Sequence, residues 1–297
     1  MGTVRVLISI PLFVMLGVAA CDQSPAPKAT VVDKVRVLGT VYPLAQVAGE
    51  VGAGQVQTEW LIEQGQSLEE LNPTPELRSR IARADLVITN GSGEEWAAAG
   101  FDDAMRANSI VRLDVLDAAR TNPGARQLWL DPVVIREAAS LIAQRLAAKR
   151  PERGAFFREN SARFAADVDA LMSEFDARIA GIKGRKLLVL SEAYSPLLQR
   201  LQLVEVRPVS ASALQLGDGE MDALRKAIRD ESPDALLLEA STPRAVQEDL
   251  SRRLGGIRLI QLDSLGTSAT GRQTWLAIMR FNLEQLTGLR ATTKPTS

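Results

Sequence analysis

The stretch PERGAFFRENSARFAADVDALMSEFDARIAGI, residues 151–182, decides how the chain is organised. Its large apolar residues recur at spacings of 7, 4, 3, 4, 4 and 3, at Phe157, Phe164, Val168, Leu171, Phe175, Ile179 and Ile182. These spacings place them on one face of a helix, and no Pro or Gly interrupts the run between Gly154 and Gly181. The pattern predicts one long helix. Two interpretations stay open: a core helix of one domain, or a rigid rod that joins two lobes.

Short β-branched runs alternate with helical stretches on both sides of this helix. We expect strands at 35–41, 58–63, 86–91, 110–115, 186–191, 203–209, 235–240 and 257–264. Helices are expected at 44–51, 74–84, 94–108, 196–201, 221–230, 242–254 and 271–287. Such alternation predicts parallel sheets with helices on their faces. The expected fold class is α/β: two lobes, each a parallel sheet flanked by helices, joined by one long rigid helix.

The N-terminus resembles a bacterial lipoprotein signal. Arg5 precedes an apolar run at 6–20 that is too short for a transmembrane helix and ends in small residues. The run leads into Val-Ala-Ala-Cys21, similar to a lipobox, and Cys21 is the only Cys in the chain. Asp22 resembles the signal that retains lipoproteins at the inner membrane of Gram-negative cells. These features predict a lipid-anchored protein on the periplasmic side of that membrane.

The expected domain boundaries follow from these patterns. A signal peptide covers 1–20, a lipidated, Pro-rich tether 21–33, the N-terminal lobe 34–150, the linking helix 151–183, the C-terminal lobe 184–290 and a tail 291–297.

Composition excludes several classes of function. The 297 residues carry a formal net charge of −1, which gives no electrostatic case for binding nucleic acid. The chain has no His, so His-based catalysis and His-bearing metal sites are excluded. One Cys leaves no internal disulfide and no Cys-rich metal cluster. Because neither an oxyanion loop nor a Ser-Lys pair can be identified, we do not expect an enzyme.

Four segments together resemble the solute-binding proteins of zinc- and manganese-type ABC transporters. They are GQSLEELNPTP at 65–75, ADLVITNG at 84–91, WLDP at 129–132 and, after Glu239, LDSLG at 262–266. The resemblance covers nearly the whole chain after the signal. It implies two α/β lobes joined by one long helix. The lobes are expected to move little on binding, because a single stiff helix is a poor hinge. It also implies a monomer that works with an ABC permease in the inner membrane and carries a metal ion.

The resemblance places the family's metal ligands at positions where this chain differs from it. Three positions usually held by His are Glu69, Gln127 and Ser191, with Glu192 adjacent to the last, and only the fourth ligand survives as the carboxylate Asp263. These side chains offer oxygen donors alone. Oxygen sets favour Mn²⁺ or Fe²⁺ over Zn²⁺, which prefers imidazole and thiolate. We therefore expect a divalent metal site built from oxygen ligands between the lobes.

An alternative interpretation is that the site has lost its metal along with the histidines. The protein would then recognise a small organic ligand, a chelated metal or a partner protein on the same scaffold. Arg207, Arg244 and Glu239 are candidate contacts for such a ligand, although the two arginines also fit a solvated surface. The two interpretations differ at Glu69 and Asp263: unpaired carboxylates favour a cation, and an intervening Arg or Lys favours the alternative.

Overall fold

The computed structural model describes Gly2 and residues 33–62, 74–91, 105–106, 108–115, 127–209, 211–266 and 271–289. The fold described below belongs to the compact unit Asp33–Ser297. The predicted signal peptide, Cys21, most of the tether, Glu69 and nearly all of the predicted helix 94–108 lie outside the described residues.

The first sheet has four parallel strands in the order β2-β1-β3-β4. Its strands are β1 (Val35–Val41), β2 (Val56–Ile62), β3 (Leu86–Thr89) and β4 (Val111–Asp114). The chain therefore moves outward from β1 to β2 and then crosses to the other side of β1. In open α/β sheets, ligands bind outside the carboxyl ends of the strands at such a switch point.

The second sheet repeats this topology, with four parallel strands in the order β6-β5-β7-β8. Its strands are β5 (Lys186–Val189), β6 (Val204–Val206), β7 (Ala235–Glu239) and β8 (Leu259–Leu262). All eight predicted strands are present, and their ends differ from the expected ones by a few residues. The switch point of this sheet lies between β5 and β7.

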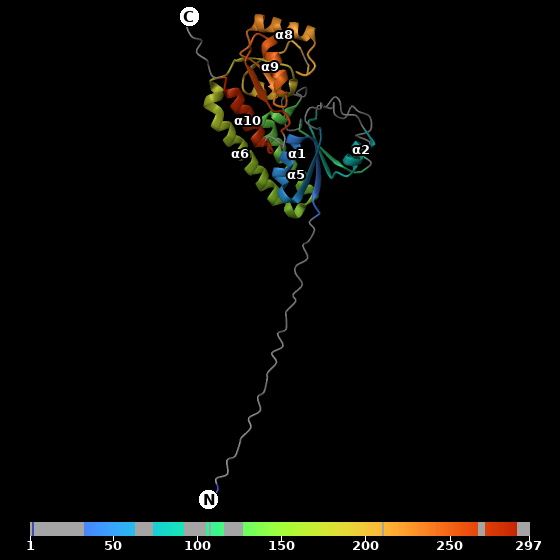
Figure 1. Ribbon diagram of the computed structural model, residues 1–297. Helices are drawn as coiled ribbons and strands as arrows, with labels where there is room; N and C mark the ends of the chain where they lie inside the picture. Colours follow the sequence, from blue (N-terminus) through green and yellow to red (C-terminus); the bar gives the residue numbers. More distant parts are fainter. Residues whose placement is uncertain are drawn as a thin grey trace. The chain divides into compact units, whose positions relative to one another are not determined.

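Helices flank both sheets (Figure 1). Those before the long helix are α1 (Tyr42–Gly52), α2 (Pro75–Ala82) and α5 (Pro132–Lys149); those after it are α7 (Ser195–Arg200), α8 (Asp218–Glu231), α9 (Arg244–Arg253) and α10 (Trp275–Thr287). α5 was absent from the sequence-based expectation. Ala fills three of its buried positions, Ala138, Ala139 and Ala143, which weakens the contrast between its apolar and polar faces. None of the described helices is long and apolar enough to cross a membrane.

The predicted long helix is α6 (Gly154–Ala180), preceded by a short 3-10 turn at Pro151–Arg153. All seven apolar residues of the predicted face are buried. This face packs against α5 and α1 of the first half and against α10 of the second, so α6 joins the two halves. Buried Asn160 adds a polar contact, since its Nδ2 donates to the carbonyl oxygen of Val51 over 3.0 Å.

The central strands of the second sheet, β5 and β7, bury both faces. Along β5, Leu187 and Val189 belong to the large core shared with α6, whereas Leu188 and Leu190 pack with α8 and α9 in a second cluster. Successive strand residues point to opposite faces, so a strand covered on both sides needs a continuous apolar run. The run KLLVL at 186–190 is therefore typical of this central position.

Two adjacent phenylalanines on α6 test the core. The side chain of Phe157 is 0% exposed, and that of Phe156 is 37% exposed. We expect Phe157→Ala to lower the free energy of unfolding by about 3–5 kcal/mol, because it leaves a cavity. Phe156→Ala should cost about 1 kcal/mol, mainly through its edge contact with Phe157. Urea unfolding of both variants measures this, and equal losses would contradict the assigned face.

Candidate functional site

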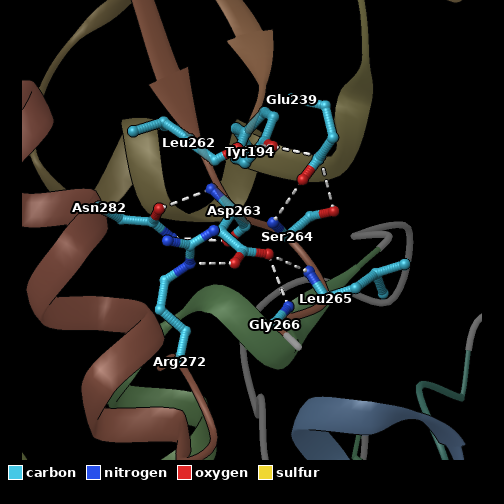
Figure 2. Close-up of polar contacts among 9 residues, drawn as sticks. All are labelled: Tyr194, Glu239, Leu262, Asp263, Ser264, Leu265, Gly266, Arg272 and Asn282. Atoms are coloured by element: carbon cyan, nitrogen blue, oxygen red, sulfur yellow. Dashed lines mark hydrogen bonds and ion pairs between the residues drawn. The ribbon is translucent and has the colours of Figure 1, made fainter. Parts of the chain in front are cut away.

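Asp263 is held rigidly just after β8. Its backbone N–H donates to Asn282 Oδ1 over 2.7 Å, and Asn282 Nδ2 donates to its carbonyl oxygen over 2.8 Å (Figure 2). Its carboxylate Oδ1 accepts from the backbone N–H groups of Leu265, at 3.1 Å, and Gly266, at 2.6 Å. Gly266 has φ +70°, and an added Cβ would lie 2.4 Å from Ile278 Cδ1, so this turn requires glycine. The carboxylate is 0% exposed and has no freedom to move away.

Arg272 neutralises this carboxylate. Its Nε forms an ion pair with Asp263 Oδ2, and its side chain is 16% exposed (Figure 2). The guanidinium carbon also lies 4.2 Å from the centroid of the Phe281 ring, within the range of a cation–π contact. A buried carboxylate without a counter-charge is strongly destabilising. Arg272 therefore does at Asp263 what a bound cation would do.

A second carboxylate, the partly buried Glu239, ends β7 and contacts residues next to Asp263. Ser264 donates to it twice, from its backbone N–H to Oε1 over 3.2 Å and from its hydroxyl to Oε2 over 2.9 Å (Figure 2). The Tyr194 hydroxyl contacts Glu239 Oε2 and lies 2.8 Å from the carbonyl oxygen of Leu262. This hydroxyl has one proton for two neighbouring oxygens. A protonated Glu239 would satisfy both contacts, because it could donate to Tyr194.

The electrostatics agree with this arrangement. Burial raises the pKa of Glu239 above its ordinary value, and the charge of Asp263 adds to the rise, while hydrogen bonds from Tyr194 and Ser264 act in the opposite direction. Burial also raises the pKa of Tyr194 well above its usual range, with the charge of Glu239 as the next cause. Tyr194 is therefore a neutral hydrogen-bonding group at any physiological pH.

Trp129 connects this site to the first half of the chain. Its indole Nε1 donates to the carbonyl oxygen of Ser264 over 2.7 Å, and its own carbonyl oxygen accepts from Trp275 Nε1 over 2.7 Å. Both indoles are buried, so these two residues serve packing. Asp131, two residues after Trp129, caps the N-terminus of α5 and forms an ion pair with Arg200 at 2.8 Å. The WLDP segment thus ties the two halves together beside Asp263.

The other described ligand positions, Gln127, Ser191 and Glu192, have contacts that differ from those of Asp263. Gln127, just before the 3-10 turn Leu128–Leu130, has φ +56°, and its buried Oε1 has no hydrogen-bond partner among the described residues. Ser191 is exposed and accepts from the N–H of Ala193 over 3.2 Å, so it caps the turn after β5. Glu192 forms an ion pair with Arg207 at 2.6 Å.

Arg207 also binds a second carboxylate. Its guanidinium lies 2.7 Å from Glu205 Oε2 and 3.1 Å from Ser195 Oγ, which itself donates to Glu205 over 2.8 Å. Two carboxylates therefore share this arginine. Arg244, the other candidate contact for an anion, is 90% exposed and pairs with Glu248 one turn further along α9.

The two described carboxylates of the predicted ligand set, Glu192 and Asp263, are thus each paired with an arginine. Within the described part of the chain, no three His, Cys, Asp or Glu side chains gather closely enough to hold a metal ion. Glu69 lies outside that part, so its distance from Asp263 stays undescribed.

Sequence reasoning missed Arg272, Tyr194 and Asn282 as parts of this site. Asn282 had a usable signal: it lies seven residues after Trp275, on the mostly apolar buried face of α10. A polar residue at such a position needs a buried partner. Arg272 carried no comparable signal, because any of many carboxylates could have been its partner.

Two sheets joined by one long helix, with polar side chains at the carboxyl ends of the second sheet, are the architecture of a two-lobed solute-binding protein. A model of the family "ZnuA: Zinc-uptake complex component A periplasmic" matches residues 37–288. The chain belongs to this family, whose members are substrate-binding transport proteins and not enzymes.

Known relatives agree with this assignment. The iron ABC transporter substrate-binding lipoprotein MtsA of Streptococcus pyogenes serotype M1 is 21% identical, covering 95% of this chain and 97% of its own. The manganese ABC transporter substrate-binding lipoprotein PsaA of Streptococcus pneumoniae is 21% identical, covering 93% and 96%. The periplasmic zinc binding protein TroA of Treponema pallidum has the same fold, with a TM-score of 0.73, 17% identity and coverage of 87% of this chain and 100% of TroA.

Glu239 makes the stability of the protein depend on pH in a defined direction. Because its pKa is raised by folding, the folded state holds the proton more tightly than the unfolded state. The stability this contributes is full below the ordinary carboxyl pKa and is lost as pH rises through the folded pKa. We expect Glu239→Gln, which mimics the protonated form, to gain stability relative to the wild type as pH rises.

Urea unfolding between pH 4 and pH 8 measures this difference. Glu174→Gln is the matched control, because the hydrogen bond from Arg280 lowers the pKa of Glu174. Its change in stability relative to the wild type should have the opposite pH dependence, and it should be small because the site is exposed. A pH-independent difference for Glu239→Gln would contradict a carboxyl group whose pKa is raised by folding.

Proposed function

We propose that this protein is the extracytoplasmic solute-binding component of an ABC importer, which captures a divalent metal ion between its lobes and delivers it to a permease in the inner membrane. The observation that carries the proposal is the family match over residues 37–288, joined to a fold that keeps a fixed, buried carboxylate, Asp263, at the carboxyl edge of the second sheet. The protein acts as a monomer and is held at the membrane by lipid on Cys21.

The proposed ligands are oxygen donors, because the chain has no His. They come from Glu69, Gln127, Ser191 or Glu192, and Asp263. The unpartnered Oε1 of Gln127 supports its place in this set, since a buried acceptor without a donor can take a cation. Such a set favours Mn²⁺ or Fe²⁺ over Zn²⁺.

The two arginines favour a second candidate function. Arg272 and Arg207 already neutralise Asp263 and Glu192, so a cargo that carries its own ligands, such as a chelated metal or a small organic molecule, would need neither carboxylate. The two candidates differ in whether a bare ion binds.

A thermal-unfolding screen of the full chain in detergent, after chelator treatment, tests the first candidate. Mn²⁺ or Fe²⁺ at about 100 times its dissociation constant should stabilise the protein by about 2.7 kcal/mol, which raises the unfolding temperature by a few degrees. The shift should persist at pH 5.5, because free carboxylates titrate near ~4. Asp263→Asn should reduce it. If no divalent ion shifts the transition at pH 5.5 or 7.5, the chelate or organic cargo becomes the function.

The lipid anchor is tested separately. Cells that express the wild-type chain should incorporate labelled palmitate into it, and Cys21→Ser should abolish the label, because no other Cys is present. Labelling of the Cys21→Ser variant would contradict the proposed anchor.

A further inference from the structure

We propose that Arg272 is a resident counter-cation that sets the metal affinity of this chain, because an incoming ion must displace its guanidinium from Asp263. The proposal rests on the proposed function only in assuming that Asp263 is a cargo ligand. Arg272 thereby becomes a residue that determines which cargo the site accepts.

The two oxygens of the Asp263 carboxylate have different roles. Oδ1 accepts from two backbone N–H groups, Leu265 and Gly266, and is saturated. Among the described residues, Oδ2 is bonded by Arg272 alone. Figure 2 shows the guanidinium of Arg272 on Oδ2. Oδ2 is therefore the oxygen left for a cation, and the guanidinium would compete with a metal ion for it.

The ion pair is built so that the arginine, and not the aspartate, can leave. Asp263 is fixed through its backbone by Asn282 and through Oδ1 by the following turn. Among the described residues, Arg272 forms one ion pair, through Nε, and its side chain is 16% exposed against 0% for Asp263. Its other described contact is the face of the Phe281 ring, which does not direct the guanidinium to one fixed geometry. A competing cation can therefore release the arginine toward solvent without moving the carboxylate.

A permanent positive charge in contact with Oδ2 opposes any divalent ion that approaches the same oxygen. Repulsion between like charges a few ångströms apart is large at the low effective dielectric of a buried site. An ion can bind only if its bonds to the other ligands outweigh this repulsion. Ions that form weaker bonds to those ligands are excluded. Loss of the charge at residue 272 should therefore tighten metal binding.

Calorimetric titration of the chelator-treated full chain with MnCl₂ and with ZnCl₂ tests the proposal. We expect Arg272→Gln to bind at least one of these ions at least tenfold more tightly than the wild type. Arg272→Lys, which keeps the charge, should resemble the wild type. Asp263→Asn combined with Arg272→Gln should lose the gain, because the ligand oxygen is gone.

Arg280→Gln is the matched control. It removes the same charge from the same part of the chain, but Arg280 pairs with Glu174 at 2.6 Å on the surface and not with Asp263. Its metal affinity should equal that of the wild type. An equal gain in this variant would mean that net charge, and not the contact with Oδ2, controls binding, and would overturn the proposal.

The outcomes separate this inference from the proposed function. Metal binding by Arg272→Gln but not by the wild type supports the inference and contradicts capture of a bare ion. Equal, tight binding by both contradicts the inference and leaves the function intact. If Arg272→Gln fails to fold with or without Mn²⁺ while the double variant folds, only a guanidinium fits against Asp263, and the inference is wrong.

Discussion

A carboxylate that is fully removed from water must be neutralised or hydrogen-bonded on every side, and Asp263 shows how this chain meets that requirement. Two backbone N–H groups take Oδ1 and the guanidinium of Arg272 takes Oδ2. The backbone of the same residue is fixed by Asn282, so the position of the last helix depends on the end of β8. Replacement of the arginine alone would leave the Asp263 charge buried and unpaired. The free energy lost in that way exceeds what the intact ion pair contributes to stability.

The fold brings this pair to the carboxyl edge of the second sheet, the edge at which open α/β sheets bind ligands. β7 and β8 end at Glu239 and Leu262, and the parallel arrangement puts the residues that follow them at one edge of the sheet. Trp129 then joins that edge to the first half through the carbonyl oxygen of Ser264. α6 packs against helices of both halves, and a stiff helix is a poor hinge. We therefore expect the site to be formed before cargo binds. Binding would then exchange the Arg272 side chain for the cargo at Asp263.

Much of this architecture could be predicted from the sequence. The β-branched runs located eight strands, and the spacing of Phe157 through Ile182 located α6, because periodicity reflects burial directly. The retained carboxylate at Asp263 was found through the resemblance. The resemblance did not indicate that Arg272 would be the partner of this carboxylate. Arg272 is one of many arginines, and which carboxylate it meets depends on the turn at Gly266 and on the packing of α10, both of which are tertiary features.

The central claim is that a metal ion and Arg272 compete for one oxygen atom. Crystals of the wild-type protein grown without metal and with Mn²⁺, measured at a wavelength where manganese scatters anomalously, test it most directly. We expect Arg272 on Asp263 in the first crystal. In the second, we expect an anomalous peak beside Asp263 Oδ2, with the guanidinium withdrawn. A manganese peak between the lobes while Arg272 still contacts Asp263 would contradict it.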